Sequence, residues 1–186
     1  MKIRIVQGNI VNYTGSAIVN AANPSLLGGG GVDGAIHQAA GPELRDECAK
    51  FPVSNNVRCD VSEVRVTDAY NLGVAKVFHT VGPIFQREGR LRPGENPNQD
   101  QSPEVLLLKT YINCLDMTEG WGFPDVAFPA ISCGVYGCPL ELGASVAANA
   151  CLSRKWDIEE VTFILFHGYE FKVFHDFFEA LGLLTD

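Results

Sequence analysis

Short strand-like runs alternate with helix-like runs along most of this 186-residue chain. This alternation is typical of an α/β domain, in which helices cover a largely parallel or mixed central sheet. It constrains the fold more than any other feature of the sequence. We expect strands at residues 3–7, 17–20, 61–67, 75–81, 126–131 and 161–166, and helices at 34–40, 42–50, 103–117, 140–152 and 171–181.

Length and composition predict a single domain, 1–186, with one hydrophobic core, because 46% of the residues are hydrophobic. The formal net charge of −8 argues against nonspecific nucleic-acid binding, which depends largely on Lys and Arg neutralising phosphates. The longest apolar runs are far shorter than the ~20 residues of a membrane helix. We therefore expect a soluble, monomeric protein that does not bind membranes.

The cysteines show no CxxC pair, and no secretory leader precedes them. Reduced thiols in the cytoplasm, or in the nucleus of a eukaryote, are therefore expected. The histidines have no metal-ligand spacing with one another or with the cysteines, so we expect neither a metal nor a cofactor. These residues are Cys48, Cys59, Cys114, Cys133, Cys138, Cys151, His37, His79, His167 and His175.

Four consecutive glycines, Gly28–Gly31, precede the run that we expect to become a helix at residue 34. Glycine leaves no side chain where a backbone must approach a partner closely. The amides at a helix N-terminus also attract anions. We interpret this segment as a phosphate-binding loop, with a flexible turn as the alternative.

A dinucleotide-binding fingerprint is also present in this loop, but its surroundings do not fit a Rossmann unit. In such a unit the glycines directly follow the first strand, and an acidic residue ends the next strand about 20 residues later. Here residues 20–27 intervene, and Asp46 and Glu47 fall in an expected helix. No GKS or GKT sequence indicates a P-loop either. The glycines with GxGxxG spacing are Gly29, Gly31 and Gly34.

A second glycine-containing loop, Ser132–Pro139, separates the expected fifth strand from the helix that begins at Leu140. Ligands of open α/β sheets bind beyond the carboxyl ends of the strands. The two loops can therefore close on one diphosphate from either side, each with backbone N–H groups. Because both loops are nearly free of Lys and Arg, we expect recognition by oriented dipoles rather than by ionic attraction.

The segment between Phe85 and Ser102 is rich in Pro, Gly, Asn and Arg and has no periodicity, which predicts a surface loop. It holds the main basic cluster of the chain, Arg87, Arg90 and Arg92. Two interpretations remain open, a solvated loop and a segment that docks a partner.

Taken in order, these motifs resemble the macrodomain family, and specifically its MacroD-type branch. The resemblance covers nearly the whole chain. It implies a three-layer α/β/α sandwich around a mixed sheet, with ADP-ribose bound at the strand ends. It also implies removal of mono-ADP-ribose from acidic side chains of proteins and deacetylation of O-acetyl-ADP-ribose. The matching segments are Gln7–Ile10, Asn20–Asn23, Gly28–Gly34, His79–Pro83 and Ser132–Pro139.

The resemblance places adenine beside Gly8, Asn9 and Ile10, with Phe166 stacked on its face. The alternative for Phe166 is an ordinary core position at a strand end. Asn9 departs from the family, which usually has Asp there to accept a hydrogen bond from the adenine amino group. A neutral acceptor forms a weaker hydrogen bond than a charged one, so we expect lower affinity or adenine selectivity.

The diphosphate is expected between the two loops, with Tyr136 beside the distal ribose or, alternatively, packing its loop onto the sheet. Cys133 stands where Thr is common in the family; we interpret it as a small loop residue, since no base is positioned to activate it. The full set expected to contact the ligand is Gly8, Asn9, Ile10, Ala21, Ala22, Asn23, Gly28, Gly29, Gly30, Gly31, Val32, Asp33, Ser132, Cys133, Gly134, Val135, Tyr136, Gly137, Cys138 and Phe166.

Three residues are expected to carry the chemistry. Asn23 would hold the ribose hydroxyls, and Asp33 would orient or activate water, with a pKa raised by the neighbouring phosphates. His37 lies one helical turn after Asp33 and would assist it. The alternatives are an N-cap role for Asp33 in a helix opening at Gly34 and packing of His37 beneath the loop. A substrate phosphate sharing the role of base also stays open.

Three hypotheses follow for the function: an ADP-ribosyl hydrolase, a macrodomain that only binds ADP-ribose, and a nucleotide-dependent oxidoreductase. Asn23, Asp33 and His37 favour the hydrolase, because binding through backbone amides does not need them. The chain is too short to hold the second domain that an oxidoreductase needs. The expected partners are ADP-ribose, its derivatives and mono-ADP-ribosylated proteins.

Overall fold

The computed structural model describes residues 1–85 and 101–185. Within these residues the strands are β1 (Lys2–Gln7), β2 (Gly15–Ala21), β3 (Val64–Asp68), β4 (Val74–Thr80), β5 (Asp125–Phe128) and β6 (Glu160–Leu165). They form one sheet in the order β1-β6-β5-β2-β4-β3. Neighbouring strands are parallel, except that β3 runs antiparallel to β4. The predicted arginine-containing surface loop lies outside the described residues.

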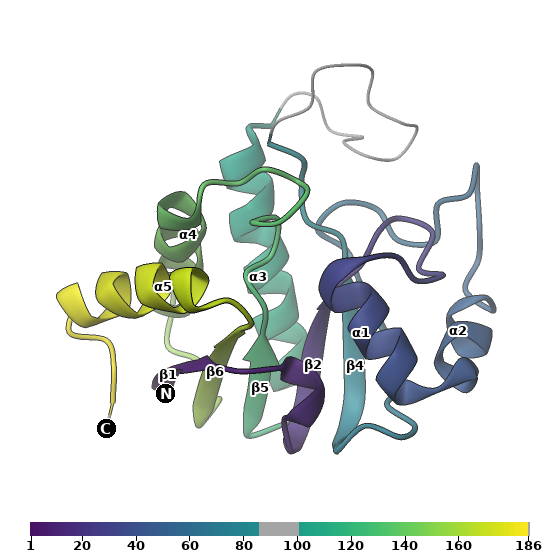
Figure 1. Ribbon diagram of the computed structural model, residues 1–186, viewed down its shortest axis with the longest axis horizontal. Helices are drawn as coiled ribbons and strands as arrows, with labels where there is room; N and C mark the ends of the chain where they lie inside the picture. Colours follow the sequence, from purple (N-terminus) through teal and green to yellow (C-terminus); the bar gives the residue numbers. More distant parts are fainter. Residues whose placement is uncertain (86–100, 186) are drawn as a thin grey trace.

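Helices cover both faces of the sheet (Figure 1). The helices of the described chain are η1 (Ile10–Asn12, a 3₁₀ turn), α1 (Gly31–Ala40), α2 (Pro42–Cys48), α3 (Pro103–Gly120), α4 (Leu140–Leu152) and α5 (Gly168–Ala180). Buried residues of α1 and α2 share one hydrophobic cluster with the sheet, and those of α3, α4 and α5 share another. The predicted three-layer α/β/α architecture is therefore confirmed.

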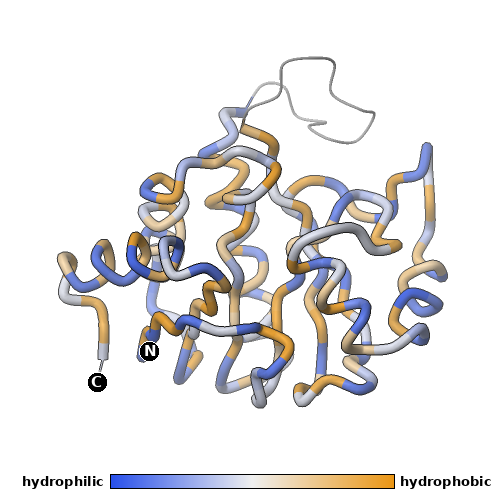
Figure 2. Tube along the Cα trace, in the orientation of Figure 1, coloured by the Kyte–Doolittle hydropathy of each residue, from blue (hydrophilic) through white to orange (hydrophobic). Residues whose placement is uncertain are grey.

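The two faces of each central strand follow from the alternation of its side chains. In β2, Ala17 and Val19 belong to the cluster with α3, α4 and α5, whereas Ile18 belongs to the cluster with α1 and α2. In β6, Phe163 and Ile164 divide in the same way. Figure 2 shows hydrophobic residues running along these central strands. A sheet buried on both faces requires such continuous apolar runs.

Two element boundaries near the loops differ from the prediction. The strand β5 ends at Phe128, because Pro129 has no N–H to donate to a neighbouring strand. The helix α1 begins at Gly31, three residues before the predicted start, so part of the glycine run forms the first helical turn. None of the described helices is long and apolar enough to cross a bilayer.

The parallel strands bring the carboxyl ends of five strands to one edge of the sheet. The carboxyl ends of β1, β6, β5, β2 and β4 all lie at this edge because these strands run in the same direction. The segments that follow β1, β2, β5 and β6 therefore meet there, although they are far apart in the sequence. This edge is where an open α/β sheet binds its ligands.

Candidate active site

A cleft of about 630 Å³ lies at the carboxyl edge of the sheet. Both predicted loops line it, as does the residue that follows β6. Gly28, His37, Gly137 and Cys138 are not in its lining. The predicted residues that line it are Gly8, Asn9, Ile10, Ala21, Ala22, Asn23, Gly29, Gly30, Gly31, Val32, Asp33, Ser132, Cys133, Gly134, Val135, Tyr136 and Phe166.

The first wall of the cleft is the N-terminus of α1. Gly30 is the N-cap and offers no side chain, so the first-turn amides of Gly31, Val32 and Asp33 have no acceptor within the helix. A Cβ built on Gly30 or on Gly31 would meet nothing within 4 Å, so the start of the helix is open at these two glycines. The wall can therefore accept an anionic group directly against the backbone.

The second wall is the segment Ser132–Cys138, which several hydrogen bonds hold in place. The Ser132 hydroxyl donates to the Pro83 carbonyl at 2.8 Å, and the Cys138 amide donates to the Ser132 carbonyl at 3.0 Å. Ser132 adopts a left-handed backbone conformation, with φ of 66°. Within the described residues, the amides of Gly134 and Val135 have no acceptor. This wall also presents backbone donors.

Asp33 is a buried carboxylate at the third position of α1, with its side chain 5% exposed. Its Oδ1 accepts a hydrogen bond from Asn20 Nδ2 at 2.8 Å, while within the described chain Oδ2 has no partner. Burial raises the pKa of Asp33, and the Asn20 hydrogen bond opposes this change. The N-cap interpretation is wrong, because Gly30 occupies that position. Asp33 is thus a carboxylate with one uncommitted oxygen at the cleft.

A hydrogen-bonded chain behind Asp33 was not predicted. The Asn20 Nδ2 that donates to Asp33 also lies 3.1 Å from His79 Nδ1, and His79 Nε2 lies 2.9 Å from Thr67 Oγ1. Burial lowers the pKa of His79 to about 3, so its ring is neutral. Because Asn20 donates to Nδ1, the imidazole proton is on Nε2. Asn20 and His79 belong to two of the segments that resemble the family. The sequence alone did not show that they contact each other behind Asp33.

Three side chains with metal-ligating atoms lie close together beside this hydrogen-bonded series. His37, Cys48 and His79 each bring a nitrogen or sulfur atom within 4.8 Å of the others. The His79 nitrogen nearest to Cys48 Sγ, at 3.7 Å, is Nε2. Both ring nitrogens of His79 already have side-chain partners, Asn20 at Nδ1 and Thr67 at Nε2. We therefore interpret this group as a buried polar cluster.

His37 lies beneath the glycine loop rather than in the cleft lining. A Cβ on Gly28 would be 3.6 Å from its ring, and its Nε2 is 3.5 Å from Asp33 Oδ1. Burial lowers the pKa of His37, although the Asp33 charge opposes this change. Within the described residues neither ring nitrogen has a hydrogen-bond partner. His37 therefore packs under the loop and touches Asp33 from behind.

Asn23 fixes the shape of the loop with its side-chain amide. Its Nδ2 donates to the Gly28 carbonyl at 3.0 Å, and its Oδ1 accepts from the amide and the hydroxyl of Ser25 at 3.1 and 2.6 Å. A Cβ on Gly29 would lie 3.1 Å from Asn23 Nδ2 and 3.0 Å from Asp33 Oδ2. The amide and the free carboxylate oxygen therefore converge at Gly29.

The other end of the cleft is aromatic and exposed. Phe166 is 64% exposed, so the core interpretation of this residue is wrong. Its ring meets His167 edge to face at 5.1 Å, and His167 stacks on Tyr169 at 5.3 Å. His167 and Tyr169 also line the cleft and were not predicted; the aromatic residues that flank Gly168 at the start of α5 are the available signal.

Asn9 also lines this end, where it caps the short helix η1. Its Oδ1 accepts a hydrogen bond from the Val11 amide at 3.2 Å. The cap therefore uses one acceptor site of the Asn9 oxygen. The Asn9 Nδ2 group, in contrast, can only donate a hydrogen bond to a ligand.

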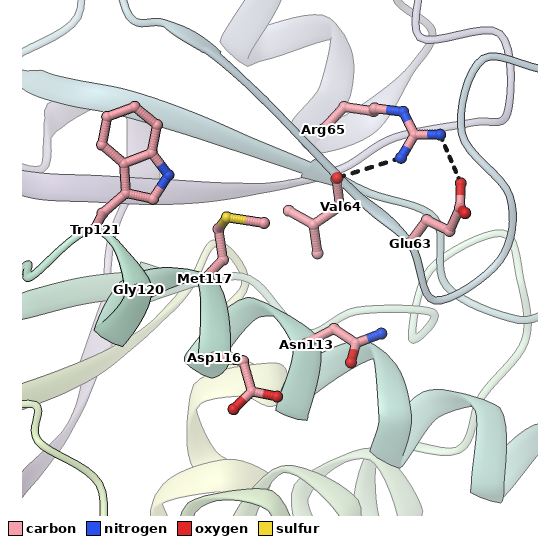
Figure 3. Close-up of a pocket in the computed structure, with 8 residues that line it drawn as sticks. All are labelled: Glu63, Val64, Arg65, Asn113, Asp116, Met117, Gly120 and Trp121. Atoms are coloured by element: carbon pink, nitrogen blue, oxygen red, sulfur yellow. Dashed lines mark hydrogen bonds and ion pairs between the residues drawn. The ribbon is translucent and has the colours of Figure 1, made fainter.

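A second hollow of about 520 Å³ lies between β3 and α3 (Figure 3). Arg65, its main cationic residue, turns toward Glu63 at 2.7 Å and toward the Val64 carbonyl at 3.4 Å. The guanidinium is thus already paired. With no converging set of unpaired polar groups among its lining residues, this hollow is a weaker candidate than the cleft at the strand ends.

The Macro domain family model matches residues 19–147. An O-acetyl-ADP-ribose deacetylase of Escherichia fergusonii is 45% identical over 80% of this chain and 77% of its own. A variant of the Oceanobacillus iheyensis macrodomain, described as with ADPR, has a TM-score of 0.83 and 36% identity and covers 95% of this chain and 91% of its own. The Trypanosoma brucei macrodomain in complex with ADP-ribose has a TM-score of 0.78 and 33% identity, with coverages of 94% and 68%. The chain belongs to the Macro domain family.

Proposed function

We propose that this protein binds ADP-ribose in the cleft and hydrolyses two kinds of ADP-ribose conjugate. These are mono-ADP-ribose on acidic side chains of proteins and O-acetyl-ADP-ribose. The observation that carries the proposal is the convergence of Asp33 Oδ2 and Asn23 Nδ2 at Gly29, beside the free amides of α1. The deacetylase name of the Escherichia fergusonii relative supports it.

The cleft accommodates ADP-ribose in one direction. The diphosphate lies between the first-turn amides of α1 and the amides of Gly134 and Val135. Adenine then stacks on Phe166, which is exposed at the other end. The distal ribose comes to Asn23 and Asp33.

Both substrates are esters of a ribose hydroxyl, and water cleaves both to ADP-ribose and a carboxylic acid. Asp33 accepts a proton from the attacking water, which then forms a bond to the anomeric carbon or to the ester carbonyl carbon. Attack at the anomeric carbon breaks the bond between that carbon and the ester oxygen, and the carboxylate leaves. Attack at the carbonyl carbon breaks the acyl–oxygen bond, and the ribose oxygen leaves and takes the proton back from Asp33. Because burial raises the pKa of Asp33, its carboxylate is a stronger base than an exposed one. Asn20 keeps that carboxylate oriented, and His79 holds Asn20.

A macrodomain that only binds ADP-ribose is the second candidate. One observation favours it: Asn23 hydrogen-bonds within its own loop, and both walls offer backbone donors. Such a site can bind ADP-ribose without catalysing a reaction.

Turnover assays separate the two candidates. The wild type, Asp33→Ala and Asn23→Ala are incubated with a protein mono-ADP-ribosylated on Glu or Asp and, in parallel, with O-acetyl-ADP-ribose. We expect release of ADP-ribose by the wild type and loss of release in Asp33→Ala, with ADP-ribose still bound in calorimetry. Binding without turnover by the wild type would establish the second candidate instead.

A further inference from the structure

The segment that joins α2 to β3, residues 49–63, lies against the loop of residues 23–30, which carries Asn23 (Figure 1). Leu26 in this loop is fully buried and adopts a left-handed backbone conformation, with φ of 60°. Residues other than glycine rarely adopt this conformation, so the surrounding packing must hold Leu26 in place. That packing includes Cys48, Cys59 and Val61, from the end of α2 and the joining segment. The shape of the loop therefore depends on residues outside it.

A tight turn fixes the part of the joining segment that faces this loop. Ser54 and Val57 exchange both backbone hydrogen bonds, at 3.0 and 2.9 Å. Between them, Asn55 and Asn56 have φ of 51° and 65°, which is typical of a two-residue hairpin turn with positive φ at both central positions. Asn is one of the residues that tolerate this conformation. Arg58 follows the turn directly, so the turn helps to fix its position.

Arg58 holds two successive carbonyl groups of the loop. Its backbone amide donates to the Pro24 carbonyl at 2.8 Å, and its Nη1 donates to the Ser25 carbonyl at 3.1 Å. Ser25 in turn donates from its amide and its hydroxyl to Asn23 Oδ1. A continuous series of hydrogen bonds therefore runs from Arg58 to the Asn23 side chain.

Arg45 also contacts the loop, but in different surroundings. It is exposed, and its Nε donates to the Leu27 carbonyl at 3.2 Å, where water can replace the donor. Arg58 is only partly exposed, and its Nε is buried without an acceptor among the described residues. A buried donor without a partner is unfavourable, so the remaining contacts must hold the guanidinium in place. Water can therefore replace the contact of Arg58 with Ser25 less easily than that of Arg45 with Leu27.

We propose that Arg58 is a positioning residue for hydrolysis. It fixes Pro24 and Ser25, and through Ser25 it orients the Asn23 amide toward the distal ribose. The inference rests on the function proposed above, in which the distal ribose comes to Asn23. Arg58 does not line the cleft, so it acts through the loop and not on the ligand.

Loss of the Arg58 side chain should lower kcat more than it raises KM. In the proposed complex, adenine stacks on Phe166 and the diphosphate lies against the backbone amides of α1, so most binding contacts remain. A displaced Asn23 instead leaves the distal ribose out of line with Asp33, and a small error in position has a large effect on the reaction rate. The chemical step therefore depends on Arg58 more than binding does.

Hydrogen exchange tests the effect of Arg58 on the loop without a ligand. The amides of Ser25, Leu26 and Leu27 donate to acceptors within the loop, so their exchange rates report its shape. In Arg58→Ala we expect these amides to exchange about tenfold faster, with the amides of α4 unchanged. In the control Arg4→Ala, which removes an exposed arginine of β1, the rates should equal those of the wild type. Unchanged exchange in Arg58→Ala would overturn the proposal.

Steady-state kinetics with O-acetyl-ADP-ribose test the effect of Arg58 on the reaction. We expect Arg58→Ala to lower kcat about tenfold, with KM within about threefold of the wild-type value. Arg58→Lys should keep both values within about threefold, because its ammonium can still donate to the single carbonyl of Ser25. Arg4→Ala should match the wild type. If the wild type is active and Arg58→Ala has the same kcat, the positioning role is wrong.

Arg58→Met replaces Arg58→Ala if the alanine variant does not fold, because it keeps the apolar stem of the side chain and removes its donors. The same faster exchange and the same fall in kcat are expected, and wild-type values of either would refute the positioning role. If the wild type itself shows no turnover, the proposed function fails, while the exchange rates still decide whether Arg58 holds the loop.

Discussion

The two ends of the cleft are built differently. At the Asp33 end, Asn20, His79 and Thr67 form a buried hydrogen-bonded chain, and Asn23 holds the glycine loop. At the Phe166 end, exposed aromatic rings stack on one another. Chemistry needs a carboxylate held in one orientation, whereas base stacking tolerates movement. Under the proposed function, we expect the first end to determine turnover and the second to determine affinity.

Replacing Asp33 should give the largest effect. We expect Asp33→Asn to lower kcat by about 10²–10⁴-fold, because the amide cannot accept the proton of water. ADP-ribose affinity should stay within a few-fold of the wild type, since the amides of α1 remain. Steady-state kinetics with O-acetyl-ADP-ribose and calorimetry with ADP-ribose provide the measurements. An unchanged kcat would refute the role of Asp33 as the base. It would also remove the expected difference in function between the two ends of the cleft.

Acid should destabilise the Asp33 end through His79. The pKa of His79 is lowered to about 3 in the fold, against about 6.5 in an unfolded chain, so the unfolded state binds more protons between these values. The stability from burying neutral His79 is therefore present above pH 6.5 and is lost as the pH falls toward 3. The free energy of unfolding should drop by about 2 kcal/mol from pH 7 to pH 5.

Urea unfolding at the two pH values measures this loss. In His79→Gln, which has no titrating ring, we expect most of the pH dependence to disappear. In the control His175→Gln, which removes a more exposed histidine of α5, it should persist. Equal pH dependence in His79→Gln and the wild type would contradict the assignment.

Phe166→Ala tests the opposite end. Loss of the stacking surface should weaken ADP-ribose binding by about 1–2 kcal/mol, with kcat on O-acetyl-ADP-ribose nearly unchanged. Protein stability should change little, because the ring is already exposed. Tyr70→Ala, which removes another exposed ring of the chain, is the control for binding. A fall in kcat equal to the fall in affinity would show that the two ends are not separable.

Asn9→Asp should give the smallest effect, a modest gain in ADP-ribose affinity at the adenine end of the cleft. Asp retains an oxygen that can cap η1, and its second oxygen can accept from the adenine amino group where Asn offers only a donor. We expect about threefold to fivefold tighter ADP-ribose binding in calorimetry. Asn12→Asp adds the same charge at the exposed end of η1 and should not tighten binding. Weaker binding by Asn9→Asp would count against the adenine contact.

The helix boundaries show where local sequence information is sufficient. The helix α4 has the predicted bounds, because Pro139 ends the loop before it and the apolar spacing continues to Leu152. The start of α1 was misplaced, because a glycine N-cap forms no side-chain hydrogen bond that would mark it. Strand β5 was predicted too long, because Pro129 is followed by apolar residues that continue the composition of the strand into the loop.

The sequence by itself determined the α/β class, the two glycine-containing loops and their place at the strand ends. These features depend on side-chain periodicity and backbone freedom, which are local. Tertiary structure alone decided that Phe166 is exposed and that Asn20 and His79 lie behind Asp33. Asn20 and His79 are 59 residues apart, and only the parallel pairing of β2 with β4 brings them together. Burial and hydrogen bonding then shift the pKa of Asp33, and burial shifts that of His79, which no local pattern in the sequence records.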